Sequence, residues 1–364
     1  GTYVRYLNNP RMYAHIIGYN SSLYGKTGLE AKYNNYLLNL RSDNPVEQLR
    51  GQMLDQGVGN NVVLTIDNRL QDACYSALDS RDQKGAIVAL NPKTGEILAS
   101  VSYPSFNVNE VDENWNDLIE DDMTPLYNRA LQGLYPPGST MKAITATTLL
   151  ETGIDLDYDD VGEETIDNYT FNNVDNEAFG EISLREALIY SSNCYFVNKT
   201  KDIPEAQLQA TIDRFMFNKE IPMELYTNAS ICKYETGMNC VLKASTCFGQ
   251  GDVLVSPLHM AMIYGAIGND GMMMKPYIVK SVKSTSGNDI YTAKNDIFGI
   301  IADAELLSKL KEYLVAMVDN NAEVAQVYGV DVAGKTGTAE VSEDGNTVHS
   351  WFVGFSNVDN PELA

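Results

Sequence analysis

The stretch 134–142 constrains the fold of this chain more than any other, because two prolines and a glycine stand directly before a run with helical periodicity. Pyrrolidine rings and Gly138 stop an extended segment, and apolar residues then recur at helical spacing from Ile144 until Gly153. A glycine at that place is a common helix terminator. The pattern therefore predicts a helix that begins at or beside Ser139 and ends at Gly153.

The spacing of Ser139 and Lys142 predicts a nucleophile with a base beside it. Residues three apart share one face of a helical turn, so the Lys142 amine should lie within reach of the Ser139 hydroxyl. A serine hydroxyl needs a neighbouring base, and burial can lower the pKa of a lysine enough for that role. Backbone N–H groups at a helix start can also receive an oxyanion. The alternative interpretation is a capping serine followed by a surface lysine.

Two other Ser-x-x-Lys copies occur, at Ser230 to Lys233 and at Ser308 to Lys311. The second copy falls in the amphipathic run 303–318, whose apolar residues recur at helical spacing. That pattern predicts that Ser308 and Lys311 both face solvent.

Composition excludes several classes of function. With 364 residues and 44% hydrophobic residues, the chain suits one large globular domain, alone or with one small domain. A formal net charge of −23 argues against binding to nucleic-acid phosphates. No window has the length and apolarity of a membrane-spanning helix. The chain opens at Gly1 without a signal-like segment, so we expect its natural start to be missing.

Cysteines and histidines do not predict a metal site. The five cysteines are scattered without a Cys-x-x-Cys pair, and the three histidines are far apart in the sequence. At most, Cys232 and Cys240 are expected to pair. A Ser-His-Asp triad stays open, because its members need not be neighbours in the chain, but no Gly-x-Ser-x-Gly motif supports one.

Local patterns predict most of the remaining elements. A strand at 62–66 leads into a helix capped by Asp67 or Asn68, with Leu70, Ala73, Cys74, Ala77 and Leu78 as its apolar stripe. A hairpin at 85–102 follows, and the acidic segment 155–181 is expected to be irregular. Alternation predicts a strand at 330–341 that turns at 344–345 and returns at 349–355.

A capping box at Ser183 and Glu186 predicts a short helix that delivers the sequence Ser191-Ser192-Asn193. This sequence lies about 50 residues after Ser139, and a Lys-Thr-Gly sequence that begins at Lys335 follows about 140 residues later. The three motifs in this order match the signature of penicillin-binding proteins and serine β-lactamases.

The surroundings of the motifs make the resemblance more specific. Pro-Pro-Gly precedes the first motif, Phe-Gly-Gln-Gly stands at 248–251, and the third motif continues as Thr-Ala-Glu before the Trp-Phe-Val-Gly of 351–354. Together these features resemble a class B penicillin-binding protein, a peptidoglycan D,D-transpeptidase. The resemblance covers residues 61–364 as a transpeptidase domain, and residues 1–60 resemble the distal part of the family's pedestal.

The resemblance implies an α+β fold, with an antiparallel sheet of about five strands between helical layers. In the family another strand and a helix follow the Trp-Phe-Val-Gly-Phe strand. We therefore expect this chain to lack that last strand and helix.

The resemblance also implies a role for each motif residue. Ser139 is the nucleophile, Lys142 the base, and Ser191 the proton route to the leaving amine. Asn193 holds the substrate amide, and the backbone N–H groups of Ser139 and Thr338 form the oxyanion hole. The residues expected to bind the substrate carboxylate or a β-lactam are Lys335, Thr336, Gly337 and Thr338.

The expected partners follow from the same resemblance. They are peptidoglycan stem peptides with a D-Ala-D-Ala donor and an amine acceptor, β-lactam antibiotics, and a glycosyltransferase. No cofactor, metal or nucleic acid is expected. The expected location is the extracytoplasmic face of the bacterial cell membrane, with a transmembrane anchor that lies outside this chain.

Two alternatives remain beside the transpeptidase. A β-lactamase or D,D-carboxypeptidase on the same fold would hydrolyse its acyl-enzyme, and a β-lactam sensor or an inactive scaffold would turn nothing over. Residues that would favour a β-lactamase stand out of order, because Ser42-Asp43-Asn44 precedes the nucleophile and Glu164 with Asn168 precedes Ser191. Further Lys-Thr-Gly copies begin at Lys26 and Lys93, where turns explain them.

Overall fold

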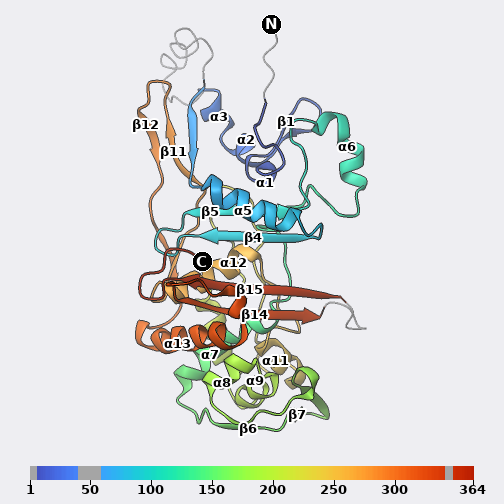
Figure 1. Cartoon of the computed structure of the whole chain (residues 1–364), viewed down its shortest axis with the longest axis vertical. Helices are drawn as coiled ribbons and strands as arrows, with labels where there is room; N and C mark the ends of the chain where they lie inside the picture. The colour runs from blue at the N-terminus through green and yellow to red at the C-terminus, as the bar shows by residue number, and fades with distance from the viewer. Residues whose placement is uncertain (1–5, 40–58, 341–346) are drawn as a thin grey trace.

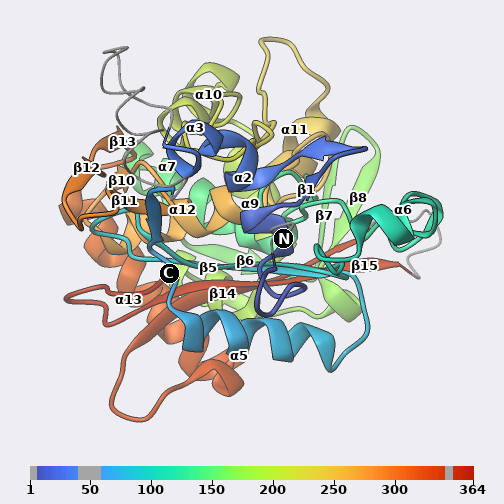
Figure 2. The same ribbon diagram turned by 90° about the horizontal axis from the view of Figure 1, so that it is seen from above.

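The computed structural model describes residues 6–39, 59–340 and 347–364, and places a layer of antiparallel strands between helices. Figure 1 shows an elongated molecule with the N-terminal elements at one end and helices α8 and α9 at the other. In Figure 2 the strand layer runs between α5 on one side and α12 on the opposite side. The expected fold class, a mixed fold with antiparallel strands between helices, is confirmed.

Two hairpins form the centre of the strand layer. β4 (Gly85–Leu90) pairs with β5 (Ile97–Tyr103), and β14 (Val332–Glu340) pairs with β15 (Val348–Ser356), as the alternating patterns predict. The predicted turn at 344–345 lies outside the described residues. Ala364 and Leu90 exchange two backbone hydrogen bonds of 2.8 and 2.9 Å, and Leu363 pairs with Ser356. The C-terminal residues therefore link the two hairpins into one layer, where a sheet of about five strands was expected.

Helix α5 (Asn68–Asp79) begins at the predicted cap, where the Asp67 carboxylate accepts hydrogen bonds from two backbone N–H groups. Its buried face differs from the predicted stripe, because Ala73 and Ala77 are exposed and Gln71 is completely buried. The Gln71 amide exchanges hydrogen bonds of 2.9 and 3.0 Å with the Ser100 backbone of β5. A buried polar side chain thus attaches this helix to the strand layer. The periodicity of apolar residues in the sequence does not reveal such a contact.

Helix α12 (Pro257–Gly268) packs against β4 and β15, and its residues from Leu258 onward are all buried. The Ser256 hydroxyl caps this helix by accepting from the His259 N–H at 3.1 Å, and Pro257 occupies its first turn. The other helices that follow Ser139 in the chain are α7 (Lys142–Thr152), α8 (Leu184–Tyr190), α9 (Asn193–Thr200), α10 (Glu205–Arg214), α11 (Cys240–Cys247) and α13 (Ala304–Asn321).

The acidic segment 155–181 is not irregular as predicted. It contains a short 3-10 turn and four short strands, which pair as β6 with β9 and as β7 with β8. Polar and acidic side chains occupy most of its exposed positions, so no apolar alternation marks these strands in the sequence. Their bounds are β6 (Tyr158–Asp160), β7 (Glu163–Ile166), β8 (Tyr169–Asn172) and β9 (Gly180–Ile182).

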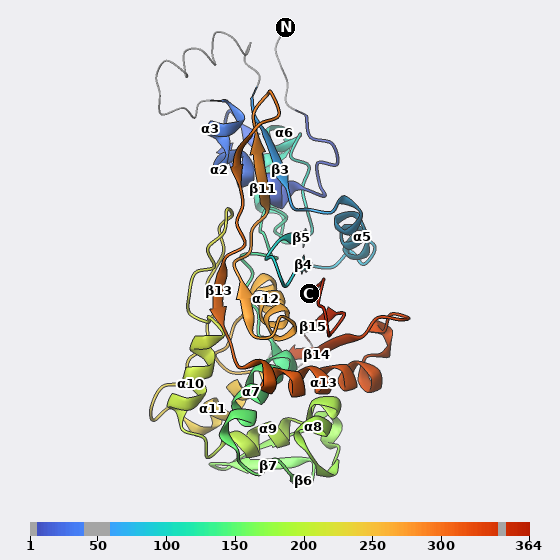
Figure 3. The ribbon, with the colours of Figure 1, turned by 90° about the vertical axis from the view of Figure 1, so that its left-hand side faces the viewer.

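Strands from the second half of the chain also lie at the N-terminal end of the molecule. β3 (Asn61–Leu64), β11 (Val279–Lys283) and β12 (Asp289–Thr292) form a three-stranded antiparallel sheet beside the N-terminal helices, as Figure 3 shows. The other elements are α1 (Ala14–Ile17), β1 (Asn20–Ser21), β2 (Gly25–Lys26), α2 (Gly28–Lys32), α3 (Asn34–Leu37), α6 (Val111–Glu120), β10 (Met272–Met274), β13 (Ile297–Ile300) and a 3-10 turn at Glu323–Ala325.

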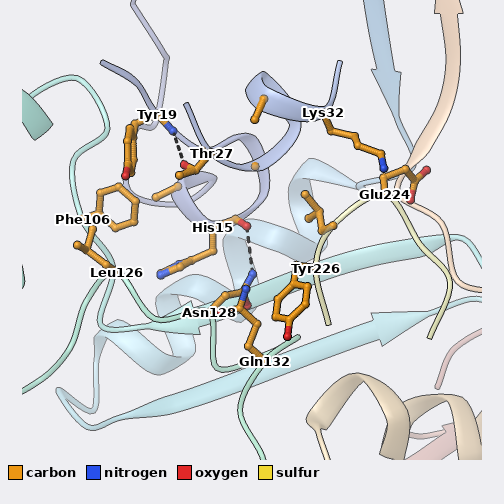
Figure 4. A pocket seen from close by; sticks show the side chains of 15 residues that line it. His15, Tyr19, Thr27, Lys32, Phe106, Leu126, Asn128, Gln132, Glu224 and Tyr226 are labelled. Carbon is orange, nitrogen blue, oxygen red and sulfur yellow. Dashed lines mark hydrogen bonds between the residues drawn. The ribbon is translucent and has the colours of Figure 1, made fainter. Parts of the chain in front are cut away.

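A cavity of about 580 Å³ marks the junction between the N-terminal segment and the rest of the chain (Figure 4). On its wall, His15 Nε2 lies 2.8 Å from the Pro125 carbonyl, and the Asn128 amide donates to the His15 carbonyl at 3.1 Å. Burial lowers the pKa of His15 to about 4. The N-terminal segment therefore contacts the rest of the chain through partly buried hydrogen bonds of the ring and backbone of His15.

All five cysteines are free thiols, so the one pairing that the sequence left open, Cys232 with Cys240, does not form; Cys232 is buried and Cys240 is exposed. In the described ranges, no helix combines the length and apolarity needed to cross a bilayer. The same ranges contain no cluster of three side chains suited to hold a metal ion.

Candidate active site

Ser139 lies in a 3-10 turn (Gly138–Met141) that leads directly into α7, so the helix begins where the sequence predicts and ends at a left-handed Gly153. The Gly138 N–H donates to the Gly249 carbonyl at 2.9 Å, which fastens the turn to the Phe-Gly-Gln-Gly segment. Ser139 itself is half-buried and lines a cavity of about 620 Å³. The hydroxyl is therefore presented to a pocket large enough for a peptide end.

Glycines allow the backbones around this turn to touch. A Cβ on Gly249 would lie 1.9 Å from the Gly138 carbonyl oxygen, and one on Gly138 would lie 2.5 Å from the Thr338 carbonyl oxygen. A Cβ on Gly337 would lie 2.9 Å from the Pro137 carbonyl oxygen. Three segments that are distant in the sequence thus meet without intervening side chains.

Lys142 is completely buried, which excludes the interpretation of a surface lysine. Its amine donates to the Ser191 carbonyl at 2.6 Å and to Asn193 Oδ1 at 2.8 Å, and it lies 3.3 Å from Ser191 Oγ. Burial, followed by repulsion from Lys335, lowers the pKa of Lys142 well below its ordinary value. In the described part of the chain the Ser139 hydroxyl makes no hydrogen bond, a common state of catalytic groups without substrate.

Ser191 lies between two amines. It ends α8 in a left-handed conformation with φ 57°, after the capping box of Ser183 and Glu186 that the sequence predicts. Its Oγ lies 3.3 Å from the Lys142 amine and 3.0 Å from the Lys335 amine. The hydroxyl is therefore placed to pass a proton between the interior and the cavity.

Lys335 comes from the middle of β14, where it pairs with Val353 of β15, and its side chain is completely buried. Burial lowers the pKa of Lys335 to about 7. Thr336, Gly337 and Thr338 follow along the strand and line the same cavity as Ser139, Ser191 and Asn193. All eight predicted site residues are thus brought to one place.

Aromatic side chains form a wall of the cavity that sequence reasoning missed. Tyr169 and Phe171 come from β8, Tyr190 from the end of α8, and Phe248 from the segment after α11. Phe171 and Phe248 meet edge to face, with ring centroids 5.9 Å apart. β8 belongs to the segment expected to be irregular, so no sequence signal placed Tyr169 and Phe171 beside the motifs.

The other motif copies lie elsewhere. Glu164 pairs with Lys201 at 3.2 Å, Lys26 and Lys93 are exposed, and none of the three lines the cavity. Ser42-Asp43-Asn44 lies outside the described residues. Ser308 is exposed as predicted, but Lys311 is not, because it is buried against Asp270 with an ion pair of 2.6 Å.

Comparison with known proteins agrees with this geometry. The family model "Penicillin binding protein transpeptidase domain" matches residues 85–364, and the "Penicillin binding protein A dimerisation domain" matches residues 1–62. The peptidoglycan D,D-transpeptidase PbpA of Mycolicibacterium smegmatis is 30% identical over 390 residues, covering 100% of this chain and 78% of the relative. The peptidoglycan D,D-transpeptidase MrdA of Acinetobacter baumannii is 29% identical, covering 99% and 62% respectively.

Solved structures give the same result. The imipenem acyl-enzyme of penicillin-binding protein A from M. tuberculosis superimposes with a TM-score of 0.91 at 29% identity, covering 98% of this chain and 85% of that one. A D,D-transpeptidase domain from Eggerthella lenta gives a TM-score of 0.88 at 32% identity, covering 100% and 87%. The transpeptidase model spans well over half of the chain, which therefore belongs to the penicillin-binding protein transpeptidase family.

Proposed function

We propose that this chain is a peptidoglycan D,D-transpeptidase that cross-links stem peptides through an acyl-enzyme on Ser139 and is inhibited by β-lactams. The observation that carries the proposal is that the buried amines of Lys142 and Lys335 both contact Ser191 Oγ, which lines the same cavity as Ser139. Relatives named D,D-transpeptidases and β-lactam acyl-enzymes of similar structures support it. Labelling with a fluorescent penicillin tests it directly.

In the proposed reaction, Lys142 takes the proton of the Ser139 hydroxyl as its oxygen attacks the carbonyl of the penultimate D-Ala. Burial keeps the lysine amine neutral enough for this step. Collapse of the tetrahedral intermediate breaks the peptide bond, and a proton relayed through Ser191 Oγ reaches the leaving D-Ala amine. An acceptor amine then attacks the ester and loses a proton to the same relay, so Ser139 is regenerated.

Substrate binding is assigned to the β14 side of the cavity. The Lys335 ammonium and the hydroxyls of Thr336 and Thr338 bind the terminal carboxylate, and Gly337 leaves room for the substrate backbone. The N–H groups of Ser139 and Thr338 receive the oxyanion. Asn193 Nδ2 donates to the Asn172 carbonyl at 3.0 Å, which turns its Oδ1 toward Lys142 and fixes the amide beside the substrate.

The pH dependence of acylation should be bell-shaped, because the two lysines are needed in opposite states. Lys142 acts as a base only when neutral, so acylation falls as the pH drops through its lowered pKa. Lys335 binds a carboxylate only when protonated, so binding weakens as the pH rises above about 7. Because the two amines interact, the apparent pKa of each limb belongs to the coupled pair of lysines and not to one lysine alone.

Acylation rates between pH 5 and 10 measure this profile. A thioester substrate with a free carboxylate should lose binding on the alkaline side, whereas its carboxamide analogue should keep only the acid limb. Identical alkaline limbs for both substrates would contradict the role of Lys335.

The acyl-enzyme is expected to be long-lived, which separates a transpeptidase from a β-lactamase. Deacylation by water needs a base over the ester carbonyl. Glu164 is engaged in an ion pair with Lys201. Glu340, at the end of β14, lies two residues beyond Thr338, roughly 7 Å along the strand. Neither carboxylate is therefore assigned the role of this base. Mixing enzyme with excess chromogenic cephalosporin should give a burst equal to the enzyme concentration and then a nearly flat trace. Sustained linear turnover would support the hydrolase instead.

We further propose that residues 61–364 act as the transpeptidase domain and residues 1–60 as part of a pedestal. Extracytoplasmic action at the bacterial membrane, with an anchor outside this chain, is the corresponding location, and a glycosyltransferase that makes the glycan strands is the corresponding partner. Co-purification of the membrane-bound protein with glycan polymerase activity tests the partnership.

A further inference from the structure

Asp160 is a buried carboxylate that the proposed reaction leaves without a role. It stands at the end of β6, is 1% exposed, and does not line the cavity. Its oxygens accept hydrogen bonds from Ser192 Oγ at 2.5 Å, Asn173 Nδ2 at 2.9 and 3.0 Å, and Gly162 N–H at 2.9 Å. A buried carboxylate is costly unless donors surround it, so these partners are fixed strongly.

Asn173 connects Asp160 to the Ser191-Ser192-Asn193 motif. Its Nδ2 donates to Asp160 and to the Glu177 carbonyl at 2.9 Å, so its Oδ1 must point the other way. That oxygen accepts from the N–H groups of Asn193 at 2.8 Å and Cys194 at 3.1 Å. A side chain outside α9 thus caps the first turn of α9 at the motif asparagine.

Ser192 provides a second link to the same turn. Its hydroxyl donates to Asp160 and accepts from the Tyr195 N–H at 2.9 Å, and the residue is completely buried. The start of α9 is therefore held from two sides, directly after the left-handed Ser191. Because Ser191 and Asn193 flank Ser192, any shift of this turn moves the oxygens that contact the Lys142 amine.

We propose that Asp160 is a positioning residue of the acylation site. Through Asn173 and Ser192 it fixes the α9 start, so that Asn193 Oδ1 and both oxygens of Ser191 meet the Lys142 amine. The inference rests on the proposed function, because it assigns Asp160 to the reaction of Ser139. Asp160 acts through other residues and does not touch substrate.

The charge of Asp160 should also affect the pKa of Lys142, which a purely structural residue would not change. Burial and the Lys335 ammonium lower the pKa of Lys142, whereas the negative charge of Asp160 raises it. Removing the Asp160 charge should lower the pKa of Lys142 further. The acid limb of the acylation profile should then move to lower pH.

Asp160→Asn is the test variant, and Asp159→Asn is its matched control, because Asp159 is the exposed neighbour on the same strand. Acylation by a fluorescent penicillin is followed at saturating and limiting concentrations, at temperatures where melting curves show each variant folded. The first-order acylation step of Asp160→Asn should fall about 10- to 100-fold, as for a small misplacement of catalytic groups. Its acid limb should move to lower pH, and Asp159→Asn should stay within about twofold of wild type.

The inference would be overturned if Asp160→Asn were acylated as fast as Asp159→Asn. It would also be overturned if the loss of acylation rate equalled the unfolded fraction of the variant, or if the acid limb of its pH profile did not move. If Asp160→Asn does not fold, Ser192→Ala replaces it, because it removes the hydroxyl that joins Asp160 to the Tyr195 N–H and leaves the Asp160 carboxylate in place. Ser192→Ala should slow acylation at least threefold with an unmoved acid limb, and wild-type speed would again overturn the inference. A wild-type chain that is not labelled at all would contradict the proposed function instead.

Discussion

Ser139→Ala is expected to abolish covalent labelling by β-lactams. The adduct is an ester to the serine oxygen, and alanine offers no atom that could form it. Intact-mass analysis of the wild type should show one adduct per chain, and the variant should show none. The variant should melt near the wild-type temperature, because the Ser139 hydroxyl makes no hydrogen bond within the described residues.

The location of the label provides the control for this experiment. Peptide mapping of the labelled wild type should find the adduct on Ser139. Ser230 is completely buried, and Ser308 lies on the exposed face of α13, away from the cavity. A label that persists in Ser139→Ala, or that maps to either serine, would show that the nucleophile has been misassigned.

Lys335→Ala should reduce the second-order rate constant of acylation by roughly 30- to 1000-fold, or about 2 to 4 kcal/mol of transition-state stabilisation. The truncation removes the ammonium that binds the substrate carboxylate and a hydrogen-bond donor 3.0 Å from Ser191 Oγ. It also leaves a space in a fully buried position. Stopped-flow fluorescence with a labelled penicillin measures the rate constant.

Lys26→Ala and Lys93→Ala are the matched controls, because each removes a lysine from another Lys-Thr-Gly sequence. Both side chains are exposed, they contact Asn34 and Asn360 respectively, and neither lysine lines the cavity. Their acylation rates should stay within about twofold of wild type. A loss at Lys93 as large as that at Lys335 would show that the wrong motif copy was chosen.

Local signals explain why so much of the site could be predicted from the sequence. Caps and turn residues mark the starts of α7 and α8, and alternation marks β14. Each of these signals acts within a few residues. The order of the motifs then identified the family, whose fold brings Ser139, Ser191 and Lys335 together.

The supporting contacts could not be predicted in the same way, because they join residues that are distant in the sequence. Asp160 reads as a surface acid in an acidic run, and its burial depends on donors 13 and 32 residues away. Lys311 reads as a solvent-facing residue of α13, and its burial depends on Asp270, 41 residues away. The periodicity of apolar residues within one helix or strand does not indicate which distant residues will contact it.

The backbone contacts among Gly138, Gly249 and Gly337 limit how this enzyme can evolve under antibiotic selection. Any mutation that adds a side chain at these positions collides with main-chain atoms, so it displaces the turn that carries Ser139, on which both the reaction and acylation by the drug depend. Tyr169, Val174 and Tyr190 line the same cavity with side chains that are 53%, 76% and 46% exposed, where replacements leave the core intact. Mutations that change drug affinity and keep the enzyme folded are therefore expected at the exposed wall of the pocket and not at the three glycines beside the Ser139 turn.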